Sequence, residues 1–195
     1  MRPGPVTLEG RHVRLEPLAH RHAEDLLAAA QDPGIWLYMP KPMPRTLADI
    51  RAFIDDALKL QDGGTVLPFA QIDRASGRAF GSTRYMDIRA ADDGLEIGWT
   101  WLGTAYQRTV LNTEAKYLLL SHAFDALGAI RVQLKTDLRN VRSQTAIARL
   151  GAVREGVLRN HMRMWDGYIR DSVYFSILDR EWPAVRDGLL AKLAK

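Results

Sequence analysis

The sequence lacks cysteine, and it lacks any long apolar run. Without cysteine there are no disulfides, no thiolate metal ligands and no cysteine nucleophile, which fits a reducing compartment. No apolar segment approaches the roughly 20 residues that a membrane-spanning helix needs, and residues 1–13 have no apolar core of the kind found in signal peptides. We therefore expect a cytoplasmic protein that has no membrane partner.

Motifs for metal ions and nucleotides are also missing. The five histidines show no ligand spacing with carboxylates, and the pair His20 and His22 is typical of a helix start. Neither a GxGxxG pattern nor a P-loop is present, which argues against dinucleotide or ATP chemistry. We predict that the protein has no metal site.

Charge of one sign is in small excess, with 27 Lys and Arg against 23 Asp and Glu and a formal net charge of +4. A positive excess favours an anionic partner, either a nucleotide-like cofactor or nucleic acid. The basic residues are scattered and form no block, so a solvated surface is the simpler interpretation. A nucleic-acid partner is therefore not expected.

The composition of the 195 residues, 47% hydrophobic and 26% charged, is that of an ordinary globular protein. Seven segments have the length or alternation of strands, namely residues 11–17, 67–73, 79–88, 95–102, 130–136, 155–164 and 170–178. Helical patterns occupy residues 20–30, 46–62, 113–127, 141–150 and 181–193. Short turns that contain glycine predict antiparallel hairpins. No repeat or linker interrupts these elements, so we expect one mixed α/β (α+β) domain over residues 1–195.

Two connecting segments are candidates for a binding site. Residues 32–44 carry four of the nine prolines, so we expect neither regular helix nor central strand there. Because this segment is rich in aromatic residues and methionine, it either packs on the core or lines a pocket. Residues 106–112 connect a strand to a helix that we expect to begin near Thr113, and the free N–H groups at such a helix start can bind phosphate. Many such loops bind nothing, so this pattern is weak by itself.

Combined with particular residues, this order of elements resembles the GNAT superfamily of acyl-CoA-dependent N-acetyltransferases. Its ribosomal-protein N-terminal acetyltransferase branch, of RimJ/RimL type, is the most similar. The resemblance lies in LEGRHVRLEPL, LEIGWTWL, YQRTVLNTEAKYLLLSHAFDALGAIRV and TDLRNVRSQTAIARLGAVREGVLR, and its most specific part is the set Asn140, Ser143, Ala146 and Gly151. It implies a GNAT fold, in which a mostly antiparallel seven-stranded sheet is splayed between its fourth and fifth strands and has helices on both faces.

The resemblance also implies acetyl-CoA as cosubstrate and assigns residues to it. The pantetheine arm would enter the splay, pair with the main chain of the fourth strand and contact Asn140, which is by local rules also a helix N-cap. The pyrophosphate would lie on the loop before the long helix. The cofactor-binding residues implied in this way are Trp99, Thr100, Trp101, Gln107, Arg108, Thr109, Val110, Leu111, Asn112, Thr113, Asn140 and Ser143.

The pyrophosphate loop departs from the pattern of the family, which is usually Gln/Arg-x-x-Gly-x-Gly/Ala. Here Val110 and Asn112 occupy the glycine positions. Asn tolerates the left-handed region better than other non-glycine residues, whereas Val110 should keep ordinary backbone angles or weaken binding. A charge-assisted contact from Arg108 to phosphate could offset the change, although Arg108 is also compatible with a solvated loop position.

Ser143 is the first candidate for a catalytic role. Acetyl transfer to an amine requires removal of a proton from the ammonium, stabilisation of an oxyanion and protonation of the departing thiolate. The resemblance implies that Ser143 lies beside the thioester sulfur and supplies this last proton, and a first-turn hydroxyl is electrostatically suited to a forming thiolate. The alternative is a serine that only bonds backbone.

Two residues are candidates for the general base. Glu96 opens the fourth strand within an apolar run, and an alternation of two predicts that Glu96, Gly98 and Thr100 share one face. A structural ion pair is the alternative for Glu96. His161, in RNHMR, is the second candidate because its side chain titrates near neutral pH. A third alternative is proton transfer through water with no dedicated base.

The acceptor of the acetyl group is expected to be a primary amine. We favour a protein or peptide N-terminus and place a small amine, such as a polyamine or an antibiotic-like compound, second. The alternative from another class is a non-catalytic acyl-CoA-binding or nucleic-acid-associated protein of the same fold. A homodimer is compatible with the sequence, although no local pattern predicts it.

Overall fold

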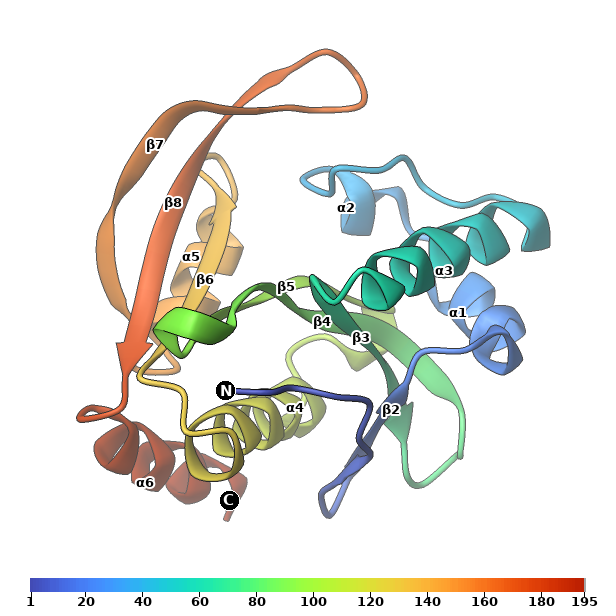
Figure 1. Ribbon diagram of the computed structural model, residues 1–195. Coiled ribbons are helices and arrows are strands. Elements are labelled where there is room, and N and C mark those ends of the chain that lie inside the picture. The colour runs from blue at the N-terminus through green and yellow to red at the C-terminus, as the bar shows by residue number, and fades with distance from the viewer. Residues whose placement is uncertain (195) are drawn as a thin grey trace.

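One twisted sheet organises the molecule (Figure 1). The computed structural model describes residues 1–194 and contains, in spatial order β1-β2-β3-β4-β5-β6-β8-β7, eight strands within that range. They are β1 (Leu8–Glu9), β2 (Val13–Pro17), β3 (Val66–Asp73), β4 (Ala79–Arg89), β5 (Gly94–Leu102), β6 (Arg131–Asp137), β7 (Val153–Arg163) and β8 (Ile169–Leu178). All neighbours are antiparallel except β5 and β6. The mixed, mostly antiparallel fold class is confirmed. The count of seven strands is wrong by one, because β1 has two residues and is too short to show alternation.

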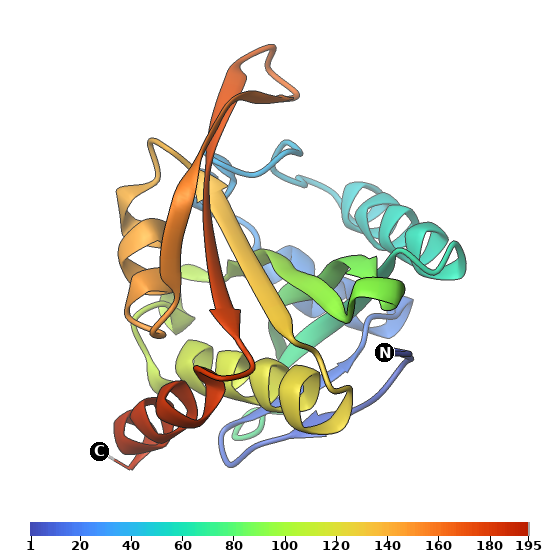
Figure 2. The same cartoon turned by 60° about the vertical axis from the view of Figure 1, so that its left-hand side comes forward.

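Helices cover both faces of the sheet, as predicted (Figures 1 and 2). They are α1 (Ala23–Ala29), α2 (Pro33–Trp36), α3 (Leu47–Asp62), α4 (Val110–Ser121), α5 (Val141–Ala148) and α6 (Trp182–Leu193). A π-helical turn over His122–Ala126 continues α4. The buried residues accordingly form two groups. One packs between the sheet and α4 with α6, around Tyr85, Leu119 and Leu189, and the other packs against α1, α2 and α3.

The proline-rich segment of residues 32–44 contains a short helix, α2, where the sequence predicted none. Pro33 occupies the first helical position, where its missing N–H costs nothing, and the Asp32 carboxylate accepts a hydrogen bond from Gly34 N at 2.8 Å. Trp36 is buried and donates from its indole to Ala30 O at 2.8 Å. Its ring lies 5.2 Å from that of Trp101. This segment therefore packs on the core through Trp36, while its Leu37 and Tyr38 line a hollow, so both alternatives apply.

Helix α4 is tied to the first hairpin of the chain by one buried carboxylate. Glu114 accepts hydrogen bonds from the backbone N–H groups of Arg11, His12 and Val13 at 2.8, 2.7 and 2.6 Å. The helix begins at Val110, three residues before the predicted start, because Thr109 provides the N-cap and accepts from Leu111 N at 3.3 Å. The first turn of α4 therefore belongs to the segment that was expected to be a loop.

The sheet is splayed between β5 and β6, which are the fourth and fifth strands of the prediction, as expected. These parallel strands pair only over residues 94–96 and 131–133. Farther along, β5 is distorted by a bulge, because Trp99 and Thr100 both lie opposite Thr83 of β4. Trp99 has φ of +50°, in the left-handed region. The bulge and the separation of the strands occur at the same place.

Candidate functional site

The bulge in β5 decides which side chains face which layer. The Thr100 hydroxyl forms a hydrogen bond with the Thr83 hydroxyl at 2.8 Å and accepts another from Lys116 Nζ of α4 at 2.7 Å. Glu96 and Gly98 lie on the other face, where a Cβ on Gly98 would meet Glu96 Oε1 at 2.8 Å. The prediction that Glu96, Gly98 and Thr100 share one face is therefore wrong for Thr100, because the extra residue at Trp99 reverses the alternation.

The two tryptophans of β5 lie on the face that carries α3. Trp101 is buried, with its ring 6.2 Å from that of Phe53, whereas Trp99 is partly buried and its ring lies 6.1 Å from the same Phe53. Their side chains belong to the core, so only their backbone groups, beside the splay, are available to a ligand. This geometry is compatible with the predicted main-chain contact.

In the loop before α4, the left-handed backbone conformation occurs at a different residue from the two positions where the family has glycine. Arg108 has φ of +61°, while Val110 and Asn112 lie in the helix with ordinary angles. The expectation of ordinary angles at Val110 is thus confirmed, and the strained position is two residues earlier than the pattern of the family indicates. The first N–H groups of α4 have no partner four residues back. Leu111 N bonds Thr109 Oγ1, so within the described chain the N–H groups of Val110 and Asn112 are left as donors for an anion.

A hollow of about 440 Å³ lies between α2, the loop before α4 and the start of α5. Its lining includes Tyr38, Gln107, Asn140 and Arg142. Arg142 donates to Gln107 Oε1 at 3.0 Å. The structure therefore brings together two residues, Gln107 and Asn140, that were assigned from the sequence to one ligand although they are far apart in the chain.

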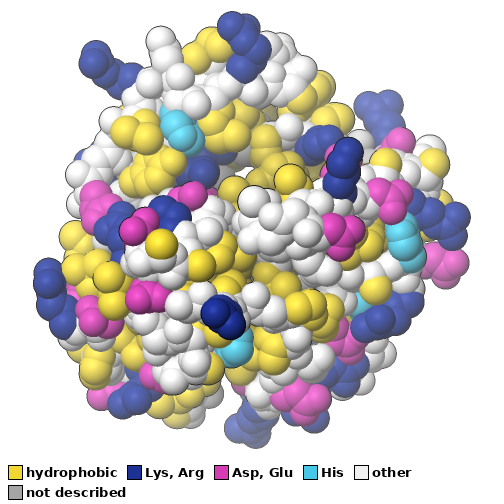
Figure 3. Space-filling view, in the orientation of Figure 1, with side chains coloured by type: hydrophobic (Ala, Val, Ile, Leu, Met, Phe, Trp, Pro, Cys, Tyr) yellow, Lys and Arg dark blue, Asp and Glu magenta, His cyan; other side chains and the backbone are white. Residues whose placement is uncertain are grey.

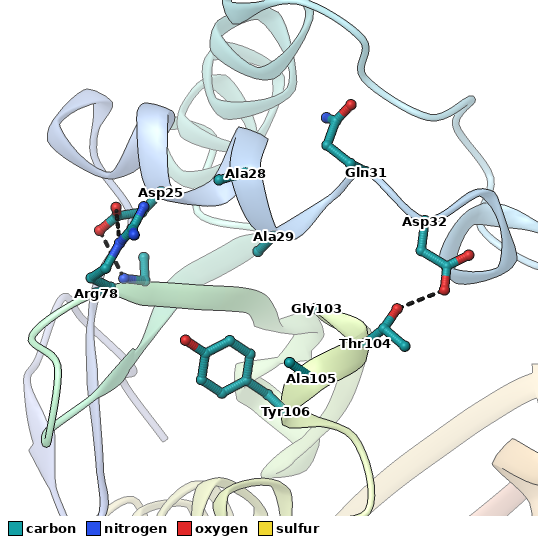
Figure 4. A pocket seen from close by; sticks show the side chains of 11 residues that line it. Asp25, Ala28, Ala29, Gln31, Asp32, Arg78, Gly103, Thr104, Ala105 and Tyr106 are labelled. Carbon is teal, nitrogen blue, oxygen red and sulfur yellow. Dashed lines mark hydrogen bonds and ion pairs between the residues drawn. The ribbon is translucent and has the colours of Figure 1, made fainter.

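A second hollow, of about 300 Å³, lies on the other side of the hydrogen bond from Thr104 to Asp32 (Figure 4). Tyr106 points into it from the loop, and the ion pair between Arg78 and Asp25 closes its far side. None of the residues assigned to the cofactor or to catalysis lines this hollow, although Asp32 and Tyr106 belong to the two candidate segments. It borders the first hollow, because Asp32 and Thr104 line both.

Asn140 caps α5 as predicted, since its side-chain oxygen Oδ1 accepts a hydrogen bond from Ser143 N at 3.0 Å. The half-buried Ser143 hydroxyl forms no hydrogen bond within residues 1–194. In contrast, Thr145 Oγ1 donates to Val141 O at 3.0 Å, the usual arrangement for a hydroxyl inside a helix. The interpretation of Ser143 as a serine that only bonds backbone does not fit its side chain, which is free for a ligand.

The candidate bases lie in one polar cluster on β5 to β8. Glu96 is 1% exposed and accepts from Gln133 Nε2 and Lys135 Nζ, both at 3.0 Å. His161 contacts Ser172 Oγ at 3.0 Å and the Tyr174 hydroxyl at 3.2 Å through its two ring nitrogens. Burial lowers the pKa of His161, and the nearby Lys135 and Arg170 lower it further. Glu96 thus forms the ion pair that was its structural alternative, and no hydrogen bond within the described chain joins either candidate to Ser143.

Several members of this arrangement were not predicted from the sequence. Lys135 and Tyr174 complete the polar cluster, with the ammonium of Lys135 5.7 Å from the centre of the Tyr174 ring. Lys116 is 7% exposed, and burial lowers its pKa to about 7. A single lysine inside the apolar run of α4 was the signal that could have revealed Lys116.

Comparison with known proteins agrees with this geometry. A sequence model of the family described as "Acetyltransferase (GNAT) domain" matches residues 12–153. The chain belongs to this family. The resemblance to GNAT enzymes is confirmed, and with it the predicted class of activity, acyl-CoA-dependent N-acetyl transfer.

Three similar proteins place this member of the GNAT family more closely. A structure of a GCN5-related N-acetyltransferase from Brucella melitensis is 35% identical, with a TM-score of 0.93, and the match covers 99% of this chain and 87% of that one. A structure from T. thermophilus, described as "putative acetyltransferase", is 41% identical with a TM-score of 0.90 and coverage of 99% and 100%. "Putative ribosomal N-acetyltransferase YdaF" of Bacillus subtilis (strain 168) is 32% identical over 87 residues. That match spans 45% of this chain and 46%, about half, of YdaF.

Two features of residues 1–194 bear on membranes and metals. No helix in this range combines the length and the apolar character that crossing a bilayer requires. The same residues contain no group of three or more His, Asp or Glu side chains placed to hold a metal ion.

Substitution of the buried lysine should change how stability depends on pH. The pKa of Lys116 is about 7 in the folded protein against its ordinary value of 10.5, so between these values the unfolded chain binds more protons and the free energy of unfolding rises with pH. We expect Lys116→Met to remove this slope and to raise the free energy of unfolding at pH 6 by several kcal/mol, with about 5 kcal/mol as the upper limit. Urea unfolding at pH 6, 7.5 and 9 measures this, and Lys59→Met, at an exposed position of α3, is the control. An equal gain at all three pH values would contradict the prediction.

The left-handed residue in the loop can be tested with two substitutions that both remove the guanidinium. Arg108→Gly should have a free energy of unfolding about 1 kcal/mol above that of Arg108→Ala, because only alanine places a Cβ in the left-handed region. At Arg142, inside α5, the order should reverse, because alanine favours helix over glycine. Urea unfolding of the four variants gives both differences. The assignment of Arg108 is wrong if the alanine variant is the more stable one at both positions.

Proposed function

We propose that this protein transfers the acetyl group of acetyl-CoA to the primary amine of a protein or peptide N-terminus. The observation that carries the proposal is the separation of β5 and β6 beyond Glu96. It leaves backbone N–H and C=O groups of both strands without a strand partner, and buried backbone groups require hydrogen bonds. A linear ligand that contains amides, such as a pantetheine arm, supplies them.

The residues around the splay fit the rest of acetyl-CoA. The first N–H groups of α4 and the cations of Arg108 and Arg142 suit a pyrophosphate. The hollow that Gln107 and Asn140 line reaches Arg142 at the start of α5. When bound, acetyl-CoA supplies an activated thioester, and all other groups that the reaction needs come from this chain and the acceptor.

We assign Ser143 the role of proton donor to the departing thiolate, because its hydroxyl is free and lies in the first turn of α5. Glu96 and His161 are the candidates for the base that accepts the proton of the amine. Lys135 pairs with Glu96 and lies beside Tyr174, which in turn contacts His161, so the two candidates belong to one network. This network lies on the same sheet face as Gly98, next to the bulge.

The choice of a protein N-terminus as acceptor is supported by the similarity to the Bacillus subtilis protein described as "Putative ribosomal N-acetyltransferase YdaF". Three further expectations from the sequence stay predictions: a single domain over residues 1–195, a cytoplasmic location and a homodimer.

The activity can be measured directly as release of free CoA thiol. Acetyl-CoA should release thiol with peptides that have a free N-terminus faster than with the same peptides after N-terminal blocking or with polyamines, because the site is proposed to take an N-terminal amine. Faster release with polyamines would favour the small-amine alternative. Binding of acetyl-CoA with no thiol release in the presence of any amine would indicate a non-catalytic acyl-CoA-binding protein. Affinity for nucleic acid that falls steeply with salt would indicate a nucleic-acid-associated protein of the same fold.

Ser143→Ala tests the proton donor. We expect kcat to fall by about 100-fold, a typical contribution of general acid catalysis, while the Kd of acetyl-CoA stays nearly unchanged because the hydroxyl acts on the leaving thiolate. Thr145→Ala is the matched control, because this hydroxyl lies in the same helix and bonds Val141 O. Steady-state kinetics and calorimetry give the two quantities. If both kcat and Kd survive in Ser143→Ala, this role for Ser143 is wrong.

A further inference from the structure

Arg84 is a buried arginine of β4 that no part of the proposed function uses. Its side chain is 2% exposed. The carbon Cζ of the guanidinium lies 4.2 Å from the centre of the Trp99 ring and 5.1 Å from that of the Phe53 ring. Burial lowers the pKa of Arg84 to about 10, so the group remains charged at neutral pH.

The guanidinium of Arg84 lacks hydrogen-bond acceptors. Its Nε is sealed from solvent and has no partner, and within residues 1–194 the group forms no hydrogen bond and no ion pair. Among residues 1–194, Asp56 is the only charged group that raises the pKa of Arg84 against the effect of burial. The Asp56 carboxylate is itself exposed and pairs with Lys41 Nζ at 2.7 Å. Aromatic faces stabilise a cation by about 0.5 to 2 kcal/mol, yet they satisfy none of its five donors.

A buried charge without a partner is costly unless something else supplies the counter-charge. Arg170 is a useful comparison, because it is also buried with an unpartnered Nε. The carboxylates of Asp137 and Glu96 lie near enough to Arg170 to raise its pKa against the effect of burial. Arg84 has no such group beside it, which points to an anion that comes from a ligand.

The position of Arg84 relates this anion to the acceptor. Arg84 pairs with Gly98 of β5, and the next residue on the same face of β4, Met86, pairs with Glu96. Residues two apart on one face of a strand are separated by about 7 Å. Arg84 and Glu96 thus start from the same face of two neighbouring strands, one such step apart along the strand direction, with Gly98 opposite Arg84.

The surface around this face is concave. Figure 3 shows hydrophobic side chains gathered in a hollow between the β7–β8 hairpin and the side of the molecule that carries α2 and α3, with Lys and Arg side chains at its edge. An acceptor that enters here would meet an apolar wall and positive charge. This environment suits a compact ligand that carries one negative group.

We propose that the acceptor amine carries a carboxylate and that Arg84 binds this carboxylate with its guanidinium. Planar, bidentate contact with a carboxylate is the arrangement that arginine favours. The carboxylate and the amine must lie a few ångströms apart in the acceptor, so that one reaches Arg84 while the other lies beside Glu96. Two sources have this chemistry: an acidic side chain at the N-terminus of a peptide, and the α-carboxylate of a free amino acid. The inference rests on the proposed acetyl transfer.

Matched acceptors test the proposal with the unmodified protein. In one arm, peptides that begin with Asp or Glu are compared with peptides that begin with Asn or Gln, and in the other arm free amino acids are compared with their carboxamides. We expect kcat/KM for the carboxylate to exceed that for the amide by about 10- to 100-fold in one of the two arms, the range for a charged hydrogen bond. The arm that shows the preference identifies the source. Equal kcat/KM values in both arms overturn the proposal.

Variants then locate the preference. Arg84→Met keeps an apolar chain between the two rings and should remove the preference by raising KM for the carboxylate-bearing acceptor more than KM for the amide. Arg78→Met removes an exposed arginine from the turn before the same strand and should keep the preference. A preference that survives in Arg84→Met overturns the assignment.

The failure of this inference is distinguishable from failure of the proposed function. Amine-dependent thiol release with no preference between carboxylate and amide contradicts only the role of Arg84. No thiol release from any amine contradicts acetyl transfer itself. If Arg84→Met does not fold, the comparison of matched acceptors with the unmodified protein still decides the question.

Discussion

Hydrogen bonding between β5 and β6 stops after the pair Glu96 and Gln133, while β5 stays paired with β4 and β6 stays paired with β8. Each strand is thus held from its outer side and open on its inner side. The bulge at Trp99 occurs where the strands part. Open backbone in the middle of a sheet needs partners, so the sheet has a built-in position for a ligand that behaves as a partial strand. The remaining features of the site are arranged around this gap.

The ends of the gap differ chemically, and that difference gives the site its direction. At one end the free N–H groups of α4 and the cations of Arg108 and Arg142 suit an anion. At the other end the polar cluster around Glu96 and the unpartnered guanidinium of Arg84 lie on the face that carries α3. Ser143, at the start of α5, is held by the cap that Asn140 forms. An acyl carrier and an acceptor can therefore approach one gap from two different surroundings.

Much of the fold could be predicted, because it depends on local patterns. The seven longer strands, the amphipathic helix α3 with its cap at Thr46, and the N-cap at Asn140 all follow from side-chain spacing and turn chemistry. The family followed from motifs that are contiguous in the chain. The errors occur where local rules compete: Thr109 rather than Thr113 marks the start of α4, and a proline at a first helical position permits α2 in a segment rich in proline.

The order of the elements, the apolar faces that bury them, and the set of polar residues around Asn140 and Ser143 follow from the chain alone, because each is encoded over a few residues. Which of these residues meet depends on the folded arrangement. The bulge at Trp99 turned Thr100 away from Glu96 and toward Lys116, since one inserted residue reverses every later side chain of a strand. The left-handed backbone conformation, which the family pattern indicates at its glycine positions, occurs instead at Arg108. The isolation of Arg84 likewise emerges only after folding, because the lack of a partner depends on every segment packed around it.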